Sequence, residues 1–165
     1  MATYSTTLTA TYISPLNDVE RINGWNKKFT IPYSFVAQAS ATTATDVVTV
    51  TLGNTPDQWA VNAARAVVTT AFTSTGTQTI TVQVGSTSSV AAFVTAQSVL
   101  TVAQLNQAST LPVLTNATAT AAVSLVATFT NAAAGSPSAE TAGSVTILLN
   151  GENVGGNTYQ PLLSS

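Results

Sequence analysis

The sequence predicts an all-β protein, a jelly-roll-like or Ig-like antiparallel β-sandwich with an N-terminal arm. Ile80, Val82 and Val84 alternate with threonine and glutamine in TQTITVQVG (77–85), which is the period of a half-buried strand. Roughly seven or eight segments of this kind are separated by turn signals, and no segment has a helical period over a useful length. A chain of 165 residues fits one domain, or one domain with an arm.

The expected strands follow one another along the chain. They span 29–39, 47–53, 63–72, 77–84, 110–115, 120–130 and 144–150. In the first strand, Pro32 lacks a backbone donor and therefore predicts an edge position or a nearby bulge. The second places Val48, Val50 and Leu52 on its inner face. Asn150-Gly151 is a turn signal that ends the last strand.

Three other segments have different patterns. In 14–24, Asn17 and Glu20 have the spacing of a helix-capping pair, which indicates one or two helical turns, with a short surface turn as the alternative. The mixed periodicity of 88–105 favours a helical turn or two inside a long connection. Residues 131–143, NAAAGSPSAETAG, are predicted to form a loop.

The beginning of the chain differs from the rest in composition. Five of the ten charged residues lie between Asp18 and Lys28, and aromatic residues gather in the same part of the sequence. From about Phe29 the pattern becomes a series of strands. We therefore expect an N-terminal arm over 1–28 and a β-sandwich domain over 29–165.

Charge is the strongest departure from an ordinary composition. Only 6% of the residues are charged, against about 25% in typical domains. A net charge of −2 creates no basic field, so neither nucleic acid nor an anionic membrane is expected as a partner. The most apolar stretch, 121–129, is too short to span a bilayer as a helix. The N-terminus lacks a signal-peptide pattern, so the product is expected in the cytoplasm of the cell that makes it.

The residue types offer little for catalysis, and an enzyme is not expected. The chain has no histidine and no cysteine, which removes the usual general base and the commonest metal ligands. Asp18 and Glu20 are the only carboxylates close in sequence, and in a turn they are better explained as capping or surface residues. No catalytic, metal or cofactor site is predicted, and we expect no cofactor.

Three larger side chains have both a binding and a structural interpretation. Trp25 and Trp59 could stack on sugars, but anchoring of the core or of an oligomer interface is the more common role. Arg65, alone within a strand, is expected to be an ion-pair partner or an interface anchor.

The outward face of the strand at 77–84 carries Thr79, Thr81 and Gln83 where lysine and glutamate are usual. Such a face loses no charge solvation when another subunit covers it, and interface cores are depleted in charge. This composition is a risk for a free monomer. It indicates a structural or interaction protein that assembles into or onto a lattice.

The run VTVTLGNTPDQWAVNAARAVVTTAFTSTGTQTITVQVGSTSSVAAFVTAQSV (48–99) resembles small virion structural proteins of tailed bacteriophages. The resemblance lies in the order of elements. A strand ends at Leu52-Gly53, and a second ends in Thr-Thr-Ala-Phe (69–72). A Thr-rich hairpin then leads to Val-Gln-Val-Gly (82–85), and a loop carries Phe93. The later segments continue it to about residue 150. Residues 88–92 depart from that group, in which acidic and glycine residues are frequent at this point, so no ion is expected in the loop.

The resemblance implies a jelly-roll-like β-sandwich on the particle that decorates or cements the capsid, without catalytic residues. The expected partners are the major capsid protein and further copies of the chain, as a homodimer or homotrimer, and the expected location is the capsid surface. The residues expected to contact the capsid or another subunit are Tyr4, Tyr12, Trp25, Phe29, Tyr33, Trp59 and Arg65. The arm either docks into clefts between capsid subunits or adds an edge strand to its own sandwich.

Two other functions stay open at this point. A tail or head-fibre component would be present in few copies and would contact the host surface. A carbohydrate-binding or adhesin module would expose Trp25 or Trp59 and bind sugar measurably.

Overall fold

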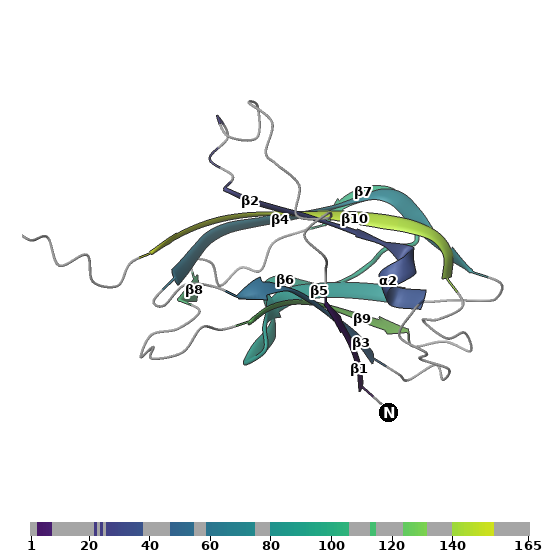
Figure 1. Ribbon diagram of the computed structural model, residues 1–165. Helices are drawn as coiled ribbons and strands as arrows, with labels where there is room; N and C mark the ends of the chain where they lie inside the picture. Colours follow the sequence, from purple (N-terminus) through teal and green to yellow (C-terminus); the bar gives the residue numbers. More distant parts are fainter. Residues whose placement is uncertain are drawn as a thin grey trace, which may run out of the picture.

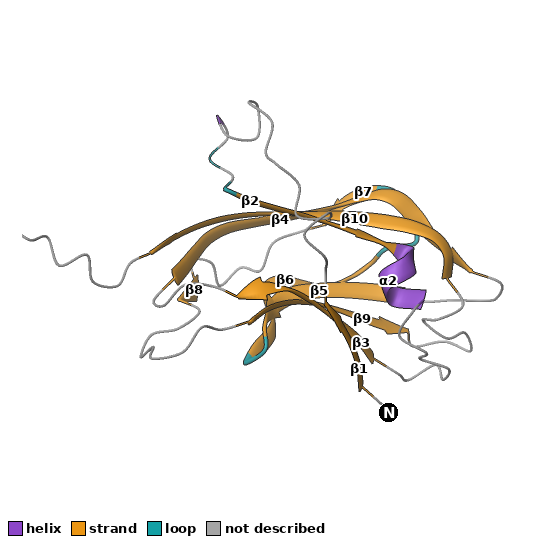
Figure 2. Cartoon of the chain, in the orientation of Figure 1, coloured by secondary structure: helices purple, strands orange, loops and turns teal. Residues whose placement is uncertain are grey.

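The computed structural model describes residues 3–7, 22, 24, 26–37, 47–54, 59–74, 80–105, 113–114, 124–131 and 140–153. The described strands form two sheets that pack face to face (Figure 1; Figure 2). The prediction of an all-β sandwich is therefore confirmed.

The first layer, sheet A, has five strands. In spatial order they are β1 (Thr3–Thr7), β3 (Val47–Asn54), β9 (Ser124–Asn131), β5 (Ile80–Ser86) and β6 (Ser89–Ser98). Strand β1 runs parallel to β3, and the other neighbours in this sheet are antiparallel.

The second layer, sheet B, is built around the two longest strands. In spatial order it contains β2 (Lys27–Pro32), β10 (Glu140–Asn153), β4 (Trp59–Ser74) and β7 (Ala103–Leu105). A short strand, β8 (Val113–Leu114), also pairs with β4. The helix α2 (Tyr33–Ala37) follows β2 and packs mainly against β10.

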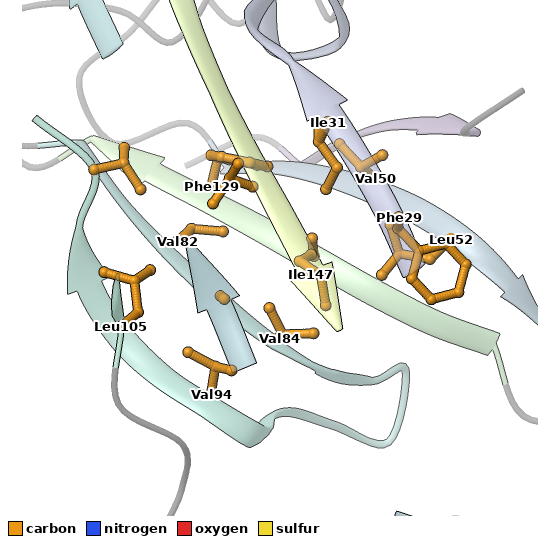
Figure 3. Close-up of a cluster of buried hydrophobic side chains, with 14 of the residues drawn as sticks. Phe29, Ile31, Val50, Leu52, Val82, Val84, Val94, Leu105, Phe129 and Ile147 are labelled. Atoms are coloured by element: carbon orange, nitrogen blue, oxygen red, sulfur yellow. The ribbon is translucent and has the colours of Figure 1, made fainter. Parts of the chain in front are cut away.

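The alternation of apolar and polar residues determines which face of each sheet is buried. In β5, Ile80, Val82 and Val84 are fully buried, whereas Thr81 and Gln83 are half-buried on the opposite face. Strand β3 and the middle of β4 follow the same period, because successive side chains point to opposite faces, whereas residues 125–129 of β9 are all buried. The apolar side chains of both sheets meet in one core (Figure 3).

Two phenylalanines connect the layers within this core. The rings of Phe72 in β4 and Phe129 in β9 lie 5.6 Å apart and are tilted by 36°, within the range of favourable aromatic pairs. Gly143 in β10 leaves room for the Phe72 ring, since a Cβ at this position would lie 2.5 Å from Phe72 Cγ. Gly143 also has a φ of 140°, which residues with a Cβ rarely adopt.

The structure corrects two expectations about secondary structure. The predicted strand 29–39 stops at Pro32 and continues as α2, which buries Phe35 and Val36. The helical turns expected in 88–105 are absent, and β6 and β7 lie there instead. Register shifts between β5 and β6 bury the adjacent Phe93 and Val94, which explains the mixed periodicity.

Several other boundaries differ from the predicted ones. Strand β10 begins at Glu140, so the end of the predicted loop 131–143 belongs to a strand. Pro32 ends β2, which is an edge strand as predicted. Most of the segment 14–24 lies outside the described residues.

Part of the predicted arm belongs to the sandwich. Residues 3–7 form β1 and pair with β3 along their whole length. Strand β2 begins at Lys27, two positions before the expected domain boundary at 29. Just before β2, Asn26 extends the pairing with β10, because Asn26 Oδ1 accepts a hydrogen bond from Gly151 N at 3.2 Å while Asn26 Nδ2 donates to Gly151 O.

The contact between Gly143 and Phe72 predicts a large effect of one methyl group. We expect Gly143→Ala to lower the free energy of unfolding by about 2–4 kcal/mol, through overpacking and backbone strain together. Gly53→Ala is the matched control, because Gly53 has the same φ of 140° and nothing within 4 Å of an added Cβ. Urea unfolding of both variants separates the two contributions. Equal losses would show that the clash with Phe72 contributes nothing.

Candidate functional site

The outward-pointing residues of sheet A, here called the A face, are uncharged, and they are exposed in β1 and mostly buried in β9. The strand registers align its residues in three rows across the sheet. The rows are Thr3–Val47–Thr130–Thr81, Ser5–Thr49–Thr128–Gln83 and Thr7–Thr51–Val126–Gly85. None of these residues carries a charge, and most carry a hydroxyl or an amide.

Burial increases from the edge of the A face toward its centre. The side chains of β1 that point to this face are exposed, those of β3 are half-buried, and Thr128 in β9 is only 4% exposed. At the end of the third row, the backbone of Ser89 and Val90 passes over Gly85, where a Cβ would lie 2.1 Å from Ser89 O. The start of β6 therefore limits the A face on that side.

The hydroxyl groups of the A face have few bonds within the chain. Thr81 Oγ1 donates to Thr130 O at 3.4 Å. Thr128 Oγ1 is buried and has no hydrogen-bond partner. Because a partly buried hydroxyl loses far less solvation than a charge when it is covered, this face can be buried by a partner at small cost.

The outer face of sheet B, here called the B face, has a different character. Lys28, Leu148 and Arg65 are aligned across three strands. One cation therefore lies on each side of Leu148, which is 6% exposed. Arg65 is half-buried, and its Nε is buried without a hydrogen-bond partner. The next row, Thr30–Thr146–Val67–Gln104, is uncharged.

The structure separates the residues expected to contact a capsid or subunit. Tyr4 is half-buried at the edge of sheet A and packs against the core. Tyr33 is 36% exposed on α2, and Arg65 lies on the B face. Phe29 is not available for a contact with a capsid or subunit, contrary to the expectation. It is 4% exposed and lies in the core opposite Ile147 of β10. These four residues do not form one surface.

Three expected contact residues are not placed by side chain. Tyr12 and Trp25 lie outside the described residues, and of Trp59 only the backbone at the start of β4 is described. The sugar-stacking interpretation depends on the two tryptophans, and neither side chain is among those that the structure describes.

No group of three or more His, Cys, Asp or Glu that could hold a metal ion occurs among the described residues. The same residues contain no helix long and apolar enough to cross a membrane.

The chain was also compared with known proteins. No family model, curated protein or solved structure matches it. The resemblance to bacteriophage virion proteins therefore stands on the sequence pattern alone.

The Thr128 hydroxyl is buried without a hydrogen-bond partner, so its removal is not expected to destabilise the protein. We expect Thr128→Val to leave stability unchanged or to raise it by up to about 1 kcal/mol, because it removes a buried polar atom without a partner. Thr81→Val on the adjacent strand removes a hydroxyl that is bonded, and is expected to lower stability by about 0.5–1.5 kcal/mol. Denaturant unfolding of both variants provides the measurement. A clear loss of stability in Thr128→Val would contradict the description of that hydroxyl as unsatisfied.

Proposed function

We propose that the chain is a non-enzymatic virion structural protein, a capsid cement or decoration protein that binds the outer shell through the A face and stabilises it. The major capsid protein is its partner. The protein acts at the capsid surface after synthesis in the host cytoplasm.

The observation that carries the proposal is the absence of charge across the A face. Its three rows span four strands of sheet A and contain only hydroxyl, amide and small apolar residues. A surface exposed only to water usually carries charges that keep molecules apart, whereas interface cores are depleted in them. The A face therefore suits contact with a protein surface.

The B face supports the choice of the A face as the binding side. Lys28 and Arg65 give the B face two cations, and these favour exposure to solvent over burial. In this orientation the A face lies on the shell and the B face points outward. Because the bound protein favours the assembled state only, its binding stabilises the shell by mass action.

A pair of isosteric substitutions tests the proposal. Gln83 lies in the middle row of the A face, and Gln104 lies in a row of the B face. We expect Gln83→Glu to weaken binding to shells that lack the protein by at least about tenfold, because an unpaired carboxylate is then covered by the partner. Gln104→Glu adds the same charge on the other face and is expected to bind like the unmodified chain.

Binding is measured as the occupancy of purified shells against protein concentration, with thermal unfolding of each variant as a folding control. Equal binding of both variants would exclude the A face as the contact surface. No binding of the unmodified chain to any shell would contradict the proposed function itself.

A further inference from the structure

The four lateral edges of the two sheets are protected to very different degrees. A free strand edge presents unpaired N–H and C=O groups, and proteins commonly block it with lysine, proline, bulges or short strands. In sheet B, edge strand β2 contains Lys27, Lys28 and Pro32, and edge strand β7 has only three residues. Both edges of sheet B thus carry a protecting device.

In sheet A, edge strand β6 is also protected. Its pairing with β5 is interrupted by register shifts. The chain then passes directly to sheet B, where Phe72 N donates to Val99 O at 2.9 Å, while Val99 N donates to Ile80 O in sheet A at 3.2 Å. The sandwich is therefore closed at this side by hydrogen bonds to both layers.

Edge strand β1 has none of these devices. Its sequence TYSTT contains no charge and no proline, and its register with β3 is uninterrupted over all five residues. Among the described strands, none pairs with its second edge. Figure 1 shows β1 at the margin of the lower layer. Threonine and tyrosine are also residues that favour strands.

We propose that β1 pairs antiparallel with β1 of a second copy of this chain, about a two-fold axis at Ser5. Two five-stranded sheets then form one continuous sheet, and the A faces of the two copies join. This inference does not rest on binding to a capsid, since it concerns the isolated protein.

The residues of β1 are complementary to themselves in this register. Ser5 lies opposite Ser5 of the partner subunit, and Thr3 lies opposite Thr7 of the partner subunit. Hydroxyl residues therefore face each other on the A face, and threonine pairs of this kind stabilise antiparallel strands. No charge is brought near another charge, and a closed two-fold contact does not propagate into filaments.

The inward side of β1 supplies a second argument. Thr6 Oγ1 is buried and has no hydrogen-bond partner, and Tyr4 is half-buried beside it on the same side of the strand. In the proposed register Thr6 lies opposite Tyr4 of the partner subunit, and pairs of an aromatic and a β-branched residue stabilise antiparallel strands. The inward side of β1 is therefore also complementary to itself across the two-fold axis.

The contact is small, so the dimer is expected to be weak in solution. Pairing through five residues buries less than the roughly 1,000 Å² of a stable interface. Copies held side by side on a surface gain from effective concentration. A covalent trap is therefore the sensitive test.

The absence of cysteine from the chain makes single-cysteine variants unambiguous. Opposed residues of antiparallel strands have Cα atoms about 4.5–5.5 Å apart, which a disulfide can bridge. We expect Ser5→Cys to form a disulfide-linked dimer under mild oxidation of the purified protein, without shells. Thr49→Cys is the matched control, because it lies one strand inward in the same row and is expected to remain monomeric.

The register has its own test. Thr3→Cys and Thr7→Cys are expected to cross-link when mixed and not when each is oxidised alone. In sedimentation experiments, Ser5→Lys is expected to raise the dimer dissociation constant at least about tenfold by charging the edge, whereas Thr49→Lys leaves it near that of the unmodified chain. Failure of Ser5→Cys to cross-link, or equal cross-linking of Thr49→Cys, overturns the proposal. Because shells are absent, neither result bears on the proposed function.

Discussion

The apolar core between the two sheets holds the layers of this protein together, and Phe72 and Phe129 are in contact across it. The two rings come from different sheets and lie 5.6 Å apart, and the apolar residues of both sheets fill the space between the layers. Gly143 gives Phe72 the room for this position. Once these faces are turned inward, the two-residue period of each strand turns the alternate residues outward.

The outward residues give the molecule two unlike sides. On sheet A they are almost entirely threonine, serine, glutamine and small apolar residues, aligned in rows by the strand registers. On sheet B they include Lys28 and Arg65. Only 6% of the chain is charged, so the distribution of the few charges determines which side can be covered at little cost. For the same reason edge strand β1 carries no charge, while edge strand β2 contains two lysines and a proline.

The sequence predicted the fold because alternation is a local signal. The strand expected at 47–53 is β3, and 144–150 lies within β10. The local signal failed where tertiary packing changed the period. Phe35 and Val36 follow the edge strand β2, and the helix α2 buries both of them. The bulged pairing of β6 buried Phe93 beside Val94 and imitated a helical pattern.

The candidate site could be predicted only in part. The neutral outward side of the strand at 77–84 was visible in the sequence, but the rows were not. The alignment of Ser5 with Thr49, Thr128 and Gln83 joins four segments that are far apart in the chain, and no local pattern contains that register. Phe29 was expected at an interface because it is aromatic and near the arm, yet its alternation with Thr30 places it in the core.

The most direct measurement of the central claim is the copy number of this chain relative to the major capsid subunit in purified particles, by quantitative mass spectrometry. A protein that covers the shell through its A face is expected in a number comparable to that of the capsid subunit. A few copies per particle would place it in the tail, neck or fibres, and its absence from the particle would contradict a virion function altogether.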